Sequence, residues 1–490
     1  MRPLEVALLI VVALAAALPL FPRTRSRILT PPLALLTLAI AVAQAVLEGP
    51  RWQLTPAWLA VLAVLVLAAR ELGRPDSAAA RTGSPAEDRA ADSPPAPRVV
   101  LRSTLLAVTA TAGVLLWAMP VVSLPVPSGP FPVGTATTVL IDEQRPEIYG
   151  PDPGGPRILP VQFWYPTLPL EELDEPEPAP WLVARDGVTR AAARDAGLPG
   201  FALSHLGLVR SNTVLDAPLA PDLELGLVLY SHGWSGFREI HITLLEELAS
   251  RGYLVIAADH TYGALATQLP DSEVAALDPA ALPSGVPSDV YDEASRRLVA
   301  TFADDLQALL DAVLRDDLLG AIVNGEQLVD TPVGLLGHST GGGAAVLLCS
   351  RDPRCGAIVG YDPWVEPVPD DVIGGDLQVP LLSLRSEEWV DNDNDVRLRR
   401  LHAGSTASEG RIAVPGLRHR DLTVLPLLSP LSAQLGLSGP GADRTALAAV
   451  DRWTVQFLEH ELRGRGADPL VVPPEPERTI LEKRAAIGGG

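Results

Sequence analysis

The segment VGLLGHSTGGGAAVLLCS (333–350) has the residue pattern of a nucleophilic serine. Ser339 stands between Gly337 and Gly341 in the order G-x-S-x-G, after a strand-like apolar run and before a helix-like run. In this context a tight strand-to-helix turn exposes the serine at the carboxyl edge of a sheet. Glycine is needed two residues before and after the serine, because side chains there would clash. The segment therefore predicts Ser339 as the nucleophile of an acyl-transfer reaction.

A serine hydroxyl is a weak nucleophile and needs a histidine base that a carboxylate orients. The chain has eight histidines, and the order serine, acid, histidine favours His419, which follows the last expected strand, 410–414. His338 belongs to the turn and should point away from the serine, and His260 precedes the serine in the chain. His232 sits in the SHGW turn after strand 225–231, and the others lack supporting context: His205, His241, His402 and His460. We therefore expect His419 to be the base.

Two positions compete for the acid that orients this base. Asp362 directly follows the expected strand 355–361 and precedes a proline, which restricts its backbone. The alternative is a polar cluster, Asp391, Asp393 and Asp395, after the next expected strand. Its loop is solvated and mobile by composition, so we favour Asp362 and keep the cluster as the alternative.

The spacing of residues 391–395 also suggests the start of a calcium loop. An EF-hand loop requires glycine at its sixth position and glutamate at its twelfth, where this chain has Val396 and His402. An EF-hand is therefore excluded, and a looser cation site remains an alternative. We expect no resident metal and no cofactor.

Acyl transfer also requires N–H donors for the oxygen that becomes negatively charged. The expected donors are the backbone N–H of Thr340, next after the nucleophile, and that of Trp234 in the loop after strand 225–231. Gly233 lets the backbone turn so that the second donor faces the serine. Trp234 and Trp364 lie beside these loops and are candidate walls of an apolar substrate pocket.

These residues require a sheet that brings their strands side by side. From about residue 136, short apolar runs alternate with amphipathic helical runs. The expected strands are 158–165, 225–231, 253–259, 333–337, 355–361 and 379–384, and the expected helices are 239–251, 289–316, 341–350 and 443–462. Continuous apolar runs of this length are typical of buried parallel strands. The alternation predicts one doubly wound, mostly parallel α/β catalytic domain over residues 158–470.

The first 124 residues have a different character. They contain four long apolar runs, near 4–21, 28–47, 54–69 and 103–124. About 20 helical residues cross the hydrocarbon core of a bilayer, so the first, second and fourth runs are long enough and the third is short. We predict a transmembrane domain of about four helices, with a disordered loop at 74–98. A Pro-rich linker, 125–157, and a tail, 471–490, flank the catalytic domain.

Arginines predict the orientation of these spans. They gather in the loop after the first run and in the loop after the third, which the positive-inside rule places in the cytoplasm. Four crossings then put the catalytic domain outside the cytoplasm, so we expect a multi-pass protein of the cell membrane. If the third run does not cross, the catalytic domain faces the cytoplasm.

Composition excludes several classes of protein. With 38 Lys and Arg against 59 Asp and Glu, the net charge of −21 argues against a nucleic-acid partner, which requires a basic surface. Two cysteines, Cys349 and Cys355, cannot form a disulfide scaffold or a Cys-based zinc module. In an extracytoplasmic domain they are candidates for one short-loop disulfide, the alternative being two buried thiols.

The chain resembles the plasma-type platelet-activating-factor acetylhydrolases and their bacterial relatives, a branch of the α/β-hydrolase superfamily. The resemblance covers about 136–465 and is carried by LVLYSHGWSGFREIHITLLEELASRGYLVIAADH, GHSTGG, PRCGAIVGYDPWVEPV and GLRHRDLTVLPLLSPL. It implies an α/β-hydrolase fold, a triad of Ser339, Asp362 and His419, and an oxyanion hole of the Trp234 and Thr340 amides. It thereby favours Asp362 over the later cluster.

This chain also departs from the family pattern. His419 is followed by Arg-Asp-Leu-Thr-Val, where relatives more often have an aromatic residue and an acid, and the apolar front has no counterpart in the plasma enzymes. The resemblance implies calcium-independent hydrolysis of phospholipids with a short or oxidised acyl chain. We therefore expect a membrane-anchored serine ester hydrolase acting on such lipid esters. The alternatives are a cutinase-like polyester or triglyceride hydrolase and a non-catalytic binding or scaffold protein of the same fold.

Overall fold

The computed structural model describes residues 1–17, 23–72, 96–315, 318, 328, 332–407 and 409–482. Contacts between residues divide the chain into two compact units, each of which is described separately. The first unit comprises Met1–Val122, Ser204–Leu208 and Leu428–Leu431, and the second comprises Ser123–Leu203, Val209–Leu427 and Ser432–Gly490.

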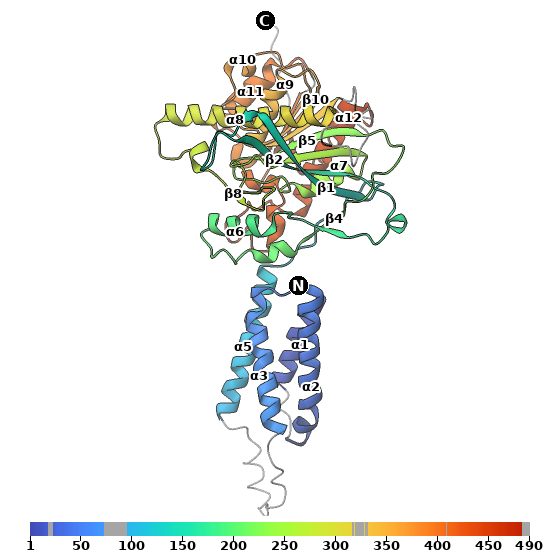
Figure 1. Cartoon of the computed structure of the whole chain (residues 1–490), viewed down its shortest axis with the longest axis vertical. Coiled ribbons are helices and arrows are strands. Elements are labelled where there is room, and N and C mark those ends of the chain that lie inside the picture. The colour runs from blue at the N-terminus through green and yellow to red at the C-terminus, as the bar shows by residue number, and fades with distance from the viewer. Residues whose placement is uncertain are drawn as a thin grey trace, which may run out of the picture. The chain divides into compact units, whose positions relative to one another are not determined.

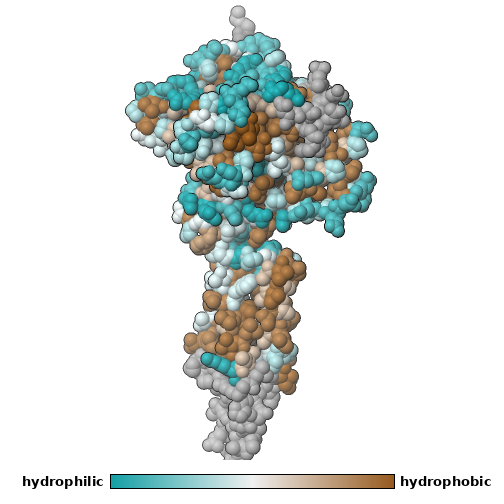
Figure 2. Space-filling model, in the orientation of Figure 1, coloured by the Kyte–Doolittle hydropathy of each residue, from teal (hydrophilic) through white to brown (hydrophobic). Residues whose placement is uncertain are grey.

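The first unit is a helical bundle of α1 (Pro3–Ala17), α2 (Arg23–Ala43), α3 (Thr55–Leu72) and α5 (Ala96–Ala118) (Figure 1). A π-helical turn, Gln44–Glu48, extends α2, and a 3-10 turn, Trp52–Leu54, leads into α3. The bundle is apolar on its outer surface as well as inside (Figure 2), as the 69% exposure of Leu35 illustrates. A helix that is apolar on all sides is typical of a large protein interior or a membrane span.

Within the described residues, three stretches are long and apolar enough to cross a membrane: Ile28–Glu48, Trp52–Arg70 and Val100–Ala118. The second of these corrects the expectation of a short third run, because the apolar helix extends to both sides of 54–69. Helix α1 has 15 residues and is shorter than a full span, whereas the run 4–21 was expected to suffice. The remainder of that run, and the expected disordered loop up to residue 95, lie outside the described residues.

The second unit is built on an 11-stranded sheet in the order β13-β12-β11-β10-β9-β5-β6-β2-β1-β4-β3. The strands before the serine turn are β1 (Val133–Pro146), β2 (Pro156–Pro166), β3 (Pro178–Pro180), β4 (Arg210–Leu215), β5 (Gly226–Ser231) and β6 (Tyr253–Ala258). Those from the turn onward are β9 (Val333–His338), β10 (Cys355–Tyr361), β11 (Leu381–Ser386), β12 (Glu409–Val414) and β13 (Ile480–Glu482). A separate hairpin pairs β7 (Ala266–Gln268) with β8 (Val274–Ala276).

The middle of the sheet is parallel. Strands β6, β5, β9, β10, β11 and β12 pair in parallel, and β2 and β13 join the two sides of this block antiparallel. Every residue of β5, β6, β9 and β11 is buried, as expected for a parallel strand covered on both faces. The chain passes from β5 to β6 on one side and returns to β9 on the other. A crevice at the carboxyl ends of β5 and β9 follows from this reversal of order.

Helices cover both faces of this sheet. The described helices of the second unit are α6 (Arg185–Asp195), α7 (Ile242–Ala249), α8 (Ser288–Leu314), α9 (Thr340–Cys349), α10 (Asp370–Ile373), α11 (Asp393–Gly404) and α12 (Arg444–Arg463). Helix α8 packs on α9, and α7 packs on α12. Successive residues of β9 show the two faces, because position 334 faces Leu458 and Leu462 of α12 whereas Leu335 joins the core of α8.

Two boundaries of the expected catalytic domain need correction. The sheet begins at Val133, inside the segment expected to be a linker (125–157), and β1 pairs with β2 along most of its length. The sequence TATTVLI favours a strand because it is rich in β-branched residues, which the prolines before residue 133 obscured. Residues Ile480–Glu482, in the expected tail, add edge strand β13 to β12. Residues 96–98, expected in the disordered loop, begin helix α5.

Candidate active site

Ser339 occupies a strained turn between β9 and α9. Its backbone has φ 53° and ψ −117°, a conformation that costs a non-glycine residue of order 1–3 kcal/mol. A Cβ at Gly337 would overlap the Gly341 carbonyl, and one at Gly341 would overlap the Ser231 carbonyl, so both glycines are required. Two hydrogen bonds hold the turn from β10 and the loop after it: Ser339 N–H donates to the Tyr361 carbonyl (3.0 Å), and Trp364 N–H donates to the Ser339 carbonyl (2.8 Å).

Asp362 follows β10 and contacts His419. Its Oδ2 lies 3.0 Å from His419 Nδ1 and accepts a 2.6 Å hydrogen bond from Ser386 Oγ, while its Oδ1 accepts a 2.9 Å bond from Ser386 N–H. We assign the ring proton of His419 to Nδ1, which then donates to Asp362 Oδ2. The other ring nitrogen, Nε2, is then free to accept a proton.

Three groups hold His419 in addition to Asp362. The Glu388 carboxylate accepts a 2.7 Å hydrogen bond from the backbone N–H of His419, and His338 Nε2 donates to the backbone carbonyl of His419 at 3.0 Å. The indole of Trp389 stacks on its ring with a centroid distance of 4.1 Å and an angle of 7° between the planes. The ring of His338 also stacks on it, at 4.5 Å. The imidazole is therefore restrained in position and in rotation.

Burial sets the protonation of this pair. It lowers the pKa of His419 to about 4, so the imidazole is neutral at pH 7, as a general base must be. Burial raises the pKa of Asp362, and the two hydrogen bonds from Ser386 act in the opposite direction.

The two expected oxyanion donors lie beside the serine turn. Trp234 N–H donates a 3.3 Å hydrogen bond to Thr340 Oγ1, and a Cβ on Gly233 would come within 2.9 Å of Ser339 Cβ. The loop after β5 therefore passes directly against the nucleophile. Thr340 is the first residue of α9, and first-turn N–H groups have no acceptor within their own helix.

The structure thus gathers the predicted residues at the carboxyl ends of β5, β9, β10 and β12. Within the described residues, Ser339 Oγ makes no hydrogen bond, so the contact between serine and base is not formed in this conformation. Such contacts are often long until substrate binds, which leaves the arrangement competent. The ring of His338 stacks on that of His419, and His419 is the histidine that contacts Asp362.

The alternative acid cluster lies elsewhere in the hydrogen-bond network. Asp395 pairs with Arg385 and Arg399, and Asp391 pairs with Arg399. Asp393 begins α11. In the described part of the chain none of the three contacts a histidine, and no group of three or more His, Cys, Asp or Glu side chains is placed to hold a metal ion. The geometry favours Asp362 as the acid.

The remaining predicted residues lie in or against the core. Trp364 is 7% exposed, and its indole N–H donates to Glu366, so it packs behind the turn instead of facing an open pocket. Trp234 is partly buried against the core. Cys349 and Cys355 are joined by a disulfide between the end of α9 and the start of β10.

Sequence reasoning missed Ser386, Glu388 and Trp389. Ser386 is the last residue of β11, and Glu388 and Trp389 follow shortly after it. Their contacts to Asp362 and His419 join the end of β11 to the ends of the neighbouring strands. The available signal was their position, because the carboxyl ends of neighbouring parallel strands meet at one edge of a sheet.

Comparisons with known proteins identify the family of this chain. A family model described as platelet-activating factor acetylhydrolase, isoform II, matches residues 118–279 and 319–466. The chain is 24% identical over 329 residues to the platelet-activating factor acetylhydrolase of Cavia porcellus, covering 62% of this chain and 72% of that protein. It is 25% identical over 245 residues to that of Gallus gallus, covering 44% and 56%.

Among solved structures, the chain is similar to a ferulic acid esterase from Streptomyces cinnamoneus. The TM-score is 0.59 and the identity 27%, covering 74% of this chain and 99% of that one. This similarity fits the α/β-hydrolase fold expected from the sequence, and the family model confirms the expected resemblance.

Proposed function

The chain belongs to the family of platelet-activating factor acetylhydrolase, isoform II, and is a carboxylic ester hydrolase; from this premise we propose a Ser-His-Asp acyl-enzyme mechanism on short-acyl or oxidised phospholipids. The observation that carries the proposal is the hydrogen bond between His419 Nδ1 and Asp362 beside the strained turn of Ser339. It leaves a neutral ring nitrogen for the serine proton.

In the first half of the reaction, His419 Nε2 takes the hydroxyl proton while Ser339 Oγ forms a bond to the ester carbonyl carbon. The bond to the alcohol oxygen then breaks, and the alcohol leaves with the proton from His419. In the second half, His419 takes a proton from water, whose oxygen forms a bond to the acyl carbon. The bond from that carbon to Ser339 Oγ then breaks, Ser339 regains its proton from His419, and the acid leaves. Asp362 holds the imidazole in the tautomer that both halves need.

The negative charge on the carbonyl oxygen requires donors that are in place before the reaction. We assign this role to the N–H groups of Trp234 and Thr340, since one lies beside the serine turn and the other begins α9. Removal of one such donor typically lowers the rate about 10²- to 10³-fold.

We also propose that the apolar helices anchor the enzyme in the cell membrane with the catalytic domain on the extracytoplasmic side. Three helices with the length and composition of spans support the anchor, and the Cys349–Cys355 disulfide supports an oxidising compartment. A phospholipid substrate is consistent with such an anchor.

The ferulic acid esterase similarity supports a second candidate, an esterase for aromatic esters. A substrate panel separates the two. We expect the full-length enzyme to hydrolyse an acetyl-phosphatidylcholine faster than tributyrin or ethyl ferulate, and a faster rate on ethyl ferulate would favour the second candidate.

Labelling with a fluorophosphonate tests the mechanism. The wild-type enzyme should be labelled, and the Ser339→Ala variant should not. Folded wild-type protein that resists the reagent and hydrolyses no ester would instead support a non-catalytic member of the family.

A further inference from the structure

The carbonyl oxygen of the peptide between Gly233 and Trp234 has two hydrogen-bond partners. His232 Nδ1 lies 2.7 Å from the Gly233 oxygen, and Gly236 N–H donates to the same oxygen at 2.9 Å. The described residues contain no cis peptide bond, and in a trans peptide the carbonyl and the following N–H point in opposite directions in one plane. Whatever holds the Gly233 oxygen therefore also aims the Trp234 N–H.

A neighbouring backbone N–H determines which ring nitrogen of His232 carries the proton. The His260 N–H donates to His232 Nε2 at 3.0 Å. Because a backbone N–H is always a donor, Nε2 carries no proton, and Nδ1 must be the protonated nitrogen that donates to Gly233. Burial and the neighbouring His260 hold the pKa of His232 well below its ordinary value, which keeps the ring neutral.

His260 is itself held from both ring nitrogens. Its Nε2 lies 2.8 Å from Ser231 Oγ and its Nδ1 lies 2.9 Å from Asp305 Oδ2, and its ring stacks on Phe302 at 3.7 Å. The end of β6, which supplies the N–H for His232, therefore cannot shift independently of helix α8.

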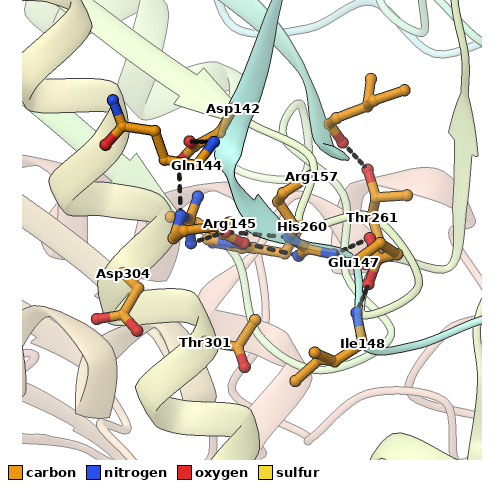
Figure 3. A network of polar contacts seen from close by, with 12 residues as sticks. Asp142, Gln144, Arg145, Glu147, Ile148, Arg157, His260, Thr261, Thr301 and Asp304 are labelled. Carbon is orange, nitrogen blue, oxygen red and sulfur yellow. Dashed lines mark hydrogen bonds and ion pairs between the residues drawn. The ribbon is translucent and has the colours of Figure 1, made fainter. Parts of the chain in front are cut away.

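Charged groups complete the support behind Asp305. Arg157 donates to both Asp305 oxygens at 3.1 and 2.7 Å, and Arg145 adds a 2.8 Å bond. Arg157 also donates to Glu147 and to the Thr261 carbonyl, and Figure 3 shows Arg145, Arg157 and His260 close together in this network. Asp305, Arg157 and His260 are each 1% exposed, so these charges compensate one another without solvent.

Ser231, His260 and Asp305 have the composition of a catalytic triad but not its access. The serine is 0% exposed and lies within strand β5, so no substrate reaches it. Its neighbour in sequence, His232, links this buried set to the loop beside the nucleophile, because it contacts both the His260 N–H and the Gly233 carbonyl.

We propose that His232 is a positioning residue for the oxyanion hole: its Nδ1–H fixes the Gly233 carbonyl and so keeps the Trp234 N–H directed at the substrate oxygen. This inference rests on the proposed function, since it assigns a second layer of support to the same site.

Two matched variants test it. In His232→Asn the side-chain amide nitrogen lies near the place of Nδ1 and can still donate to Gly233. In His232→Gln the amide lies near the place of Nε2 and can accept only from His260. Each variant loses one of the two contacts, so a purely structural role predicts similar unfolding temperatures and similar rates.

The positioning role predicts different rates. With p-nitrophenyl acetate, and with enzyme counted by fluorophosphonate titration, kcat of His232→Gln should fall at least about tenfold below that of His232→Asn, with KM changed less than about threefold. Inhibition by a trifluoromethyl ketone, whose adduct carries the oxyanion, should weaken in parallel. Equal kcat values and equal inhibition in the two variants would overturn the proposal.

A measurement on the wild-type protein removes the dependence on variant folding. In ¹⁵N-histidine NMR spectra, the ring that is hydrogen-bonded to the His260 amide should be protonated at Nδ1; protonation at Nε2 would overturn the proposal. Activity in Ser339→Ala would instead disprove the proposed function, whatever the His232 variants show.

Discussion

The catalytic domain contains two sets of serine, histidine and aspartate, and they are built differently. In the buried set, Ser231, His260 and Asp305, both hydrogen bonds are formed, at 2.8 and 2.9 Å. In the rim set, Ser339, His419 and Asp362, only the histidine–aspartate bond is formed, at 3.0 Å. The set with complete geometry is the one without access to substrate.

Backbone strain and exposure separate the two sets. Ser339 has φ 53°, whereas Ser231 lies in a regular strand. The His419 side chain is 21% exposed, and that of His260 is 2% exposed. A catalytic triad is therefore recognised by the access of its serine to substrate. The same three residue types can instead form a buried structural contact between two strands and a helix.

The carboxylates differ as well. Burial opposes ionisation of Asp305, but Arg157 and His260 outweigh it and the pKa of its carboxyl is lowered. Asp362 has neutral donors from Ser386, and burial raises its pKa. The buried set is thus an ion pair that holds structure, and the rim set pairs an acid of raised pKa with a neutral imidazole.

The largest expected effect comes from removing each serine in turn. Ser339→Ala should lower kcat/KM for a short-acyl ester by at least about 10⁴-fold, because the nucleophile is lost. Ser231→Ala should lower stability by about 1 kcal/mol through one lost hydrogen bond and change kcat/KM by less than about tenfold. Steady-state kinetics and thermal unfolding measure both.

This comparison would fail if Ser231→Ala were inactive at a native unfolding temperature. It would fail equally if Ser339→Ala kept its activity.

The two aspartates should separate activity from stability. Asp362→Asn should lower kcat about 10⁴-fold because the amide favours the wrong tautomer of His419, while the protein stays folded. Asp305→Asn should lower the free energy of unfolding by about 3–5 kcal/mol, because Arg157 and Arg145 lose their buried counter-charge. Denaturant titration and kcat at a temperature where both variants are folded distinguish these outcomes. Similar losses of stability in both variants would contradict the assignment.

Each histidine is stacked on an aromatic ring, and these rings should differ in the same way. Trp389→Ala should lower kcat about tenfold, because His419 gains rotational freedom, and Trp389→Phe should restore most of it. Phe302→Ala should instead cost about 3–5 kcal/mol of stability, since it leaves a cavity in the core. Unchanged kcat in Trp389→Ala would show that Asp362 alone is enough to hold the imidazole.

The smallest expected effect is on the pH profile. His419 acts as a base only when neutral, and burial lowers its pKa to about 4, so protonation should remove activity only as the pH falls toward that value. We expect kcat/KM at pH 5.5 to remain within about twofold of its value at pH 7. A decline centred at pH 6.5 or above would contradict the burial of the ring.

Several features of the fold could be predicted from local patterns. The stripe of α8, with Leu298, Phe302 and Leu306, is fully buried as its spacing predicts, and the apolar runs of β5, β6 and β9 form central strands. Strand β1 was missed because only its first four residues are buried and prolines precede it. Strand β13 was missed because three residues carry too little pattern.

The candidate site shows the same division. Ser339, Asp362 and His419 could be named in advance because each follows an apolar strand in the chain order of the motif. Trp389 and Ser386 could not, because a residue type does not state which neighbouring strand end it will face. Their contacts to His419 and Asp362 form only when β10, β11 and β12 lie side by side.

Local sequence was enough to specify the central strands, the family and the chemistry of the serine turn, because those depend on backbone conformation and on residues close together in the chain. Folding decided which Ser-His-Asp set reaches solvent and which is sealed by arginines. Folding also decided that the side chain of His232, which the sequence places only in the turn after β5, hydrogen-bonds the Gly233 carbonyl beside the nucleophile. Exposure and hydrogen-bond direction arise from distances across the sheet, and no local pattern records those distances.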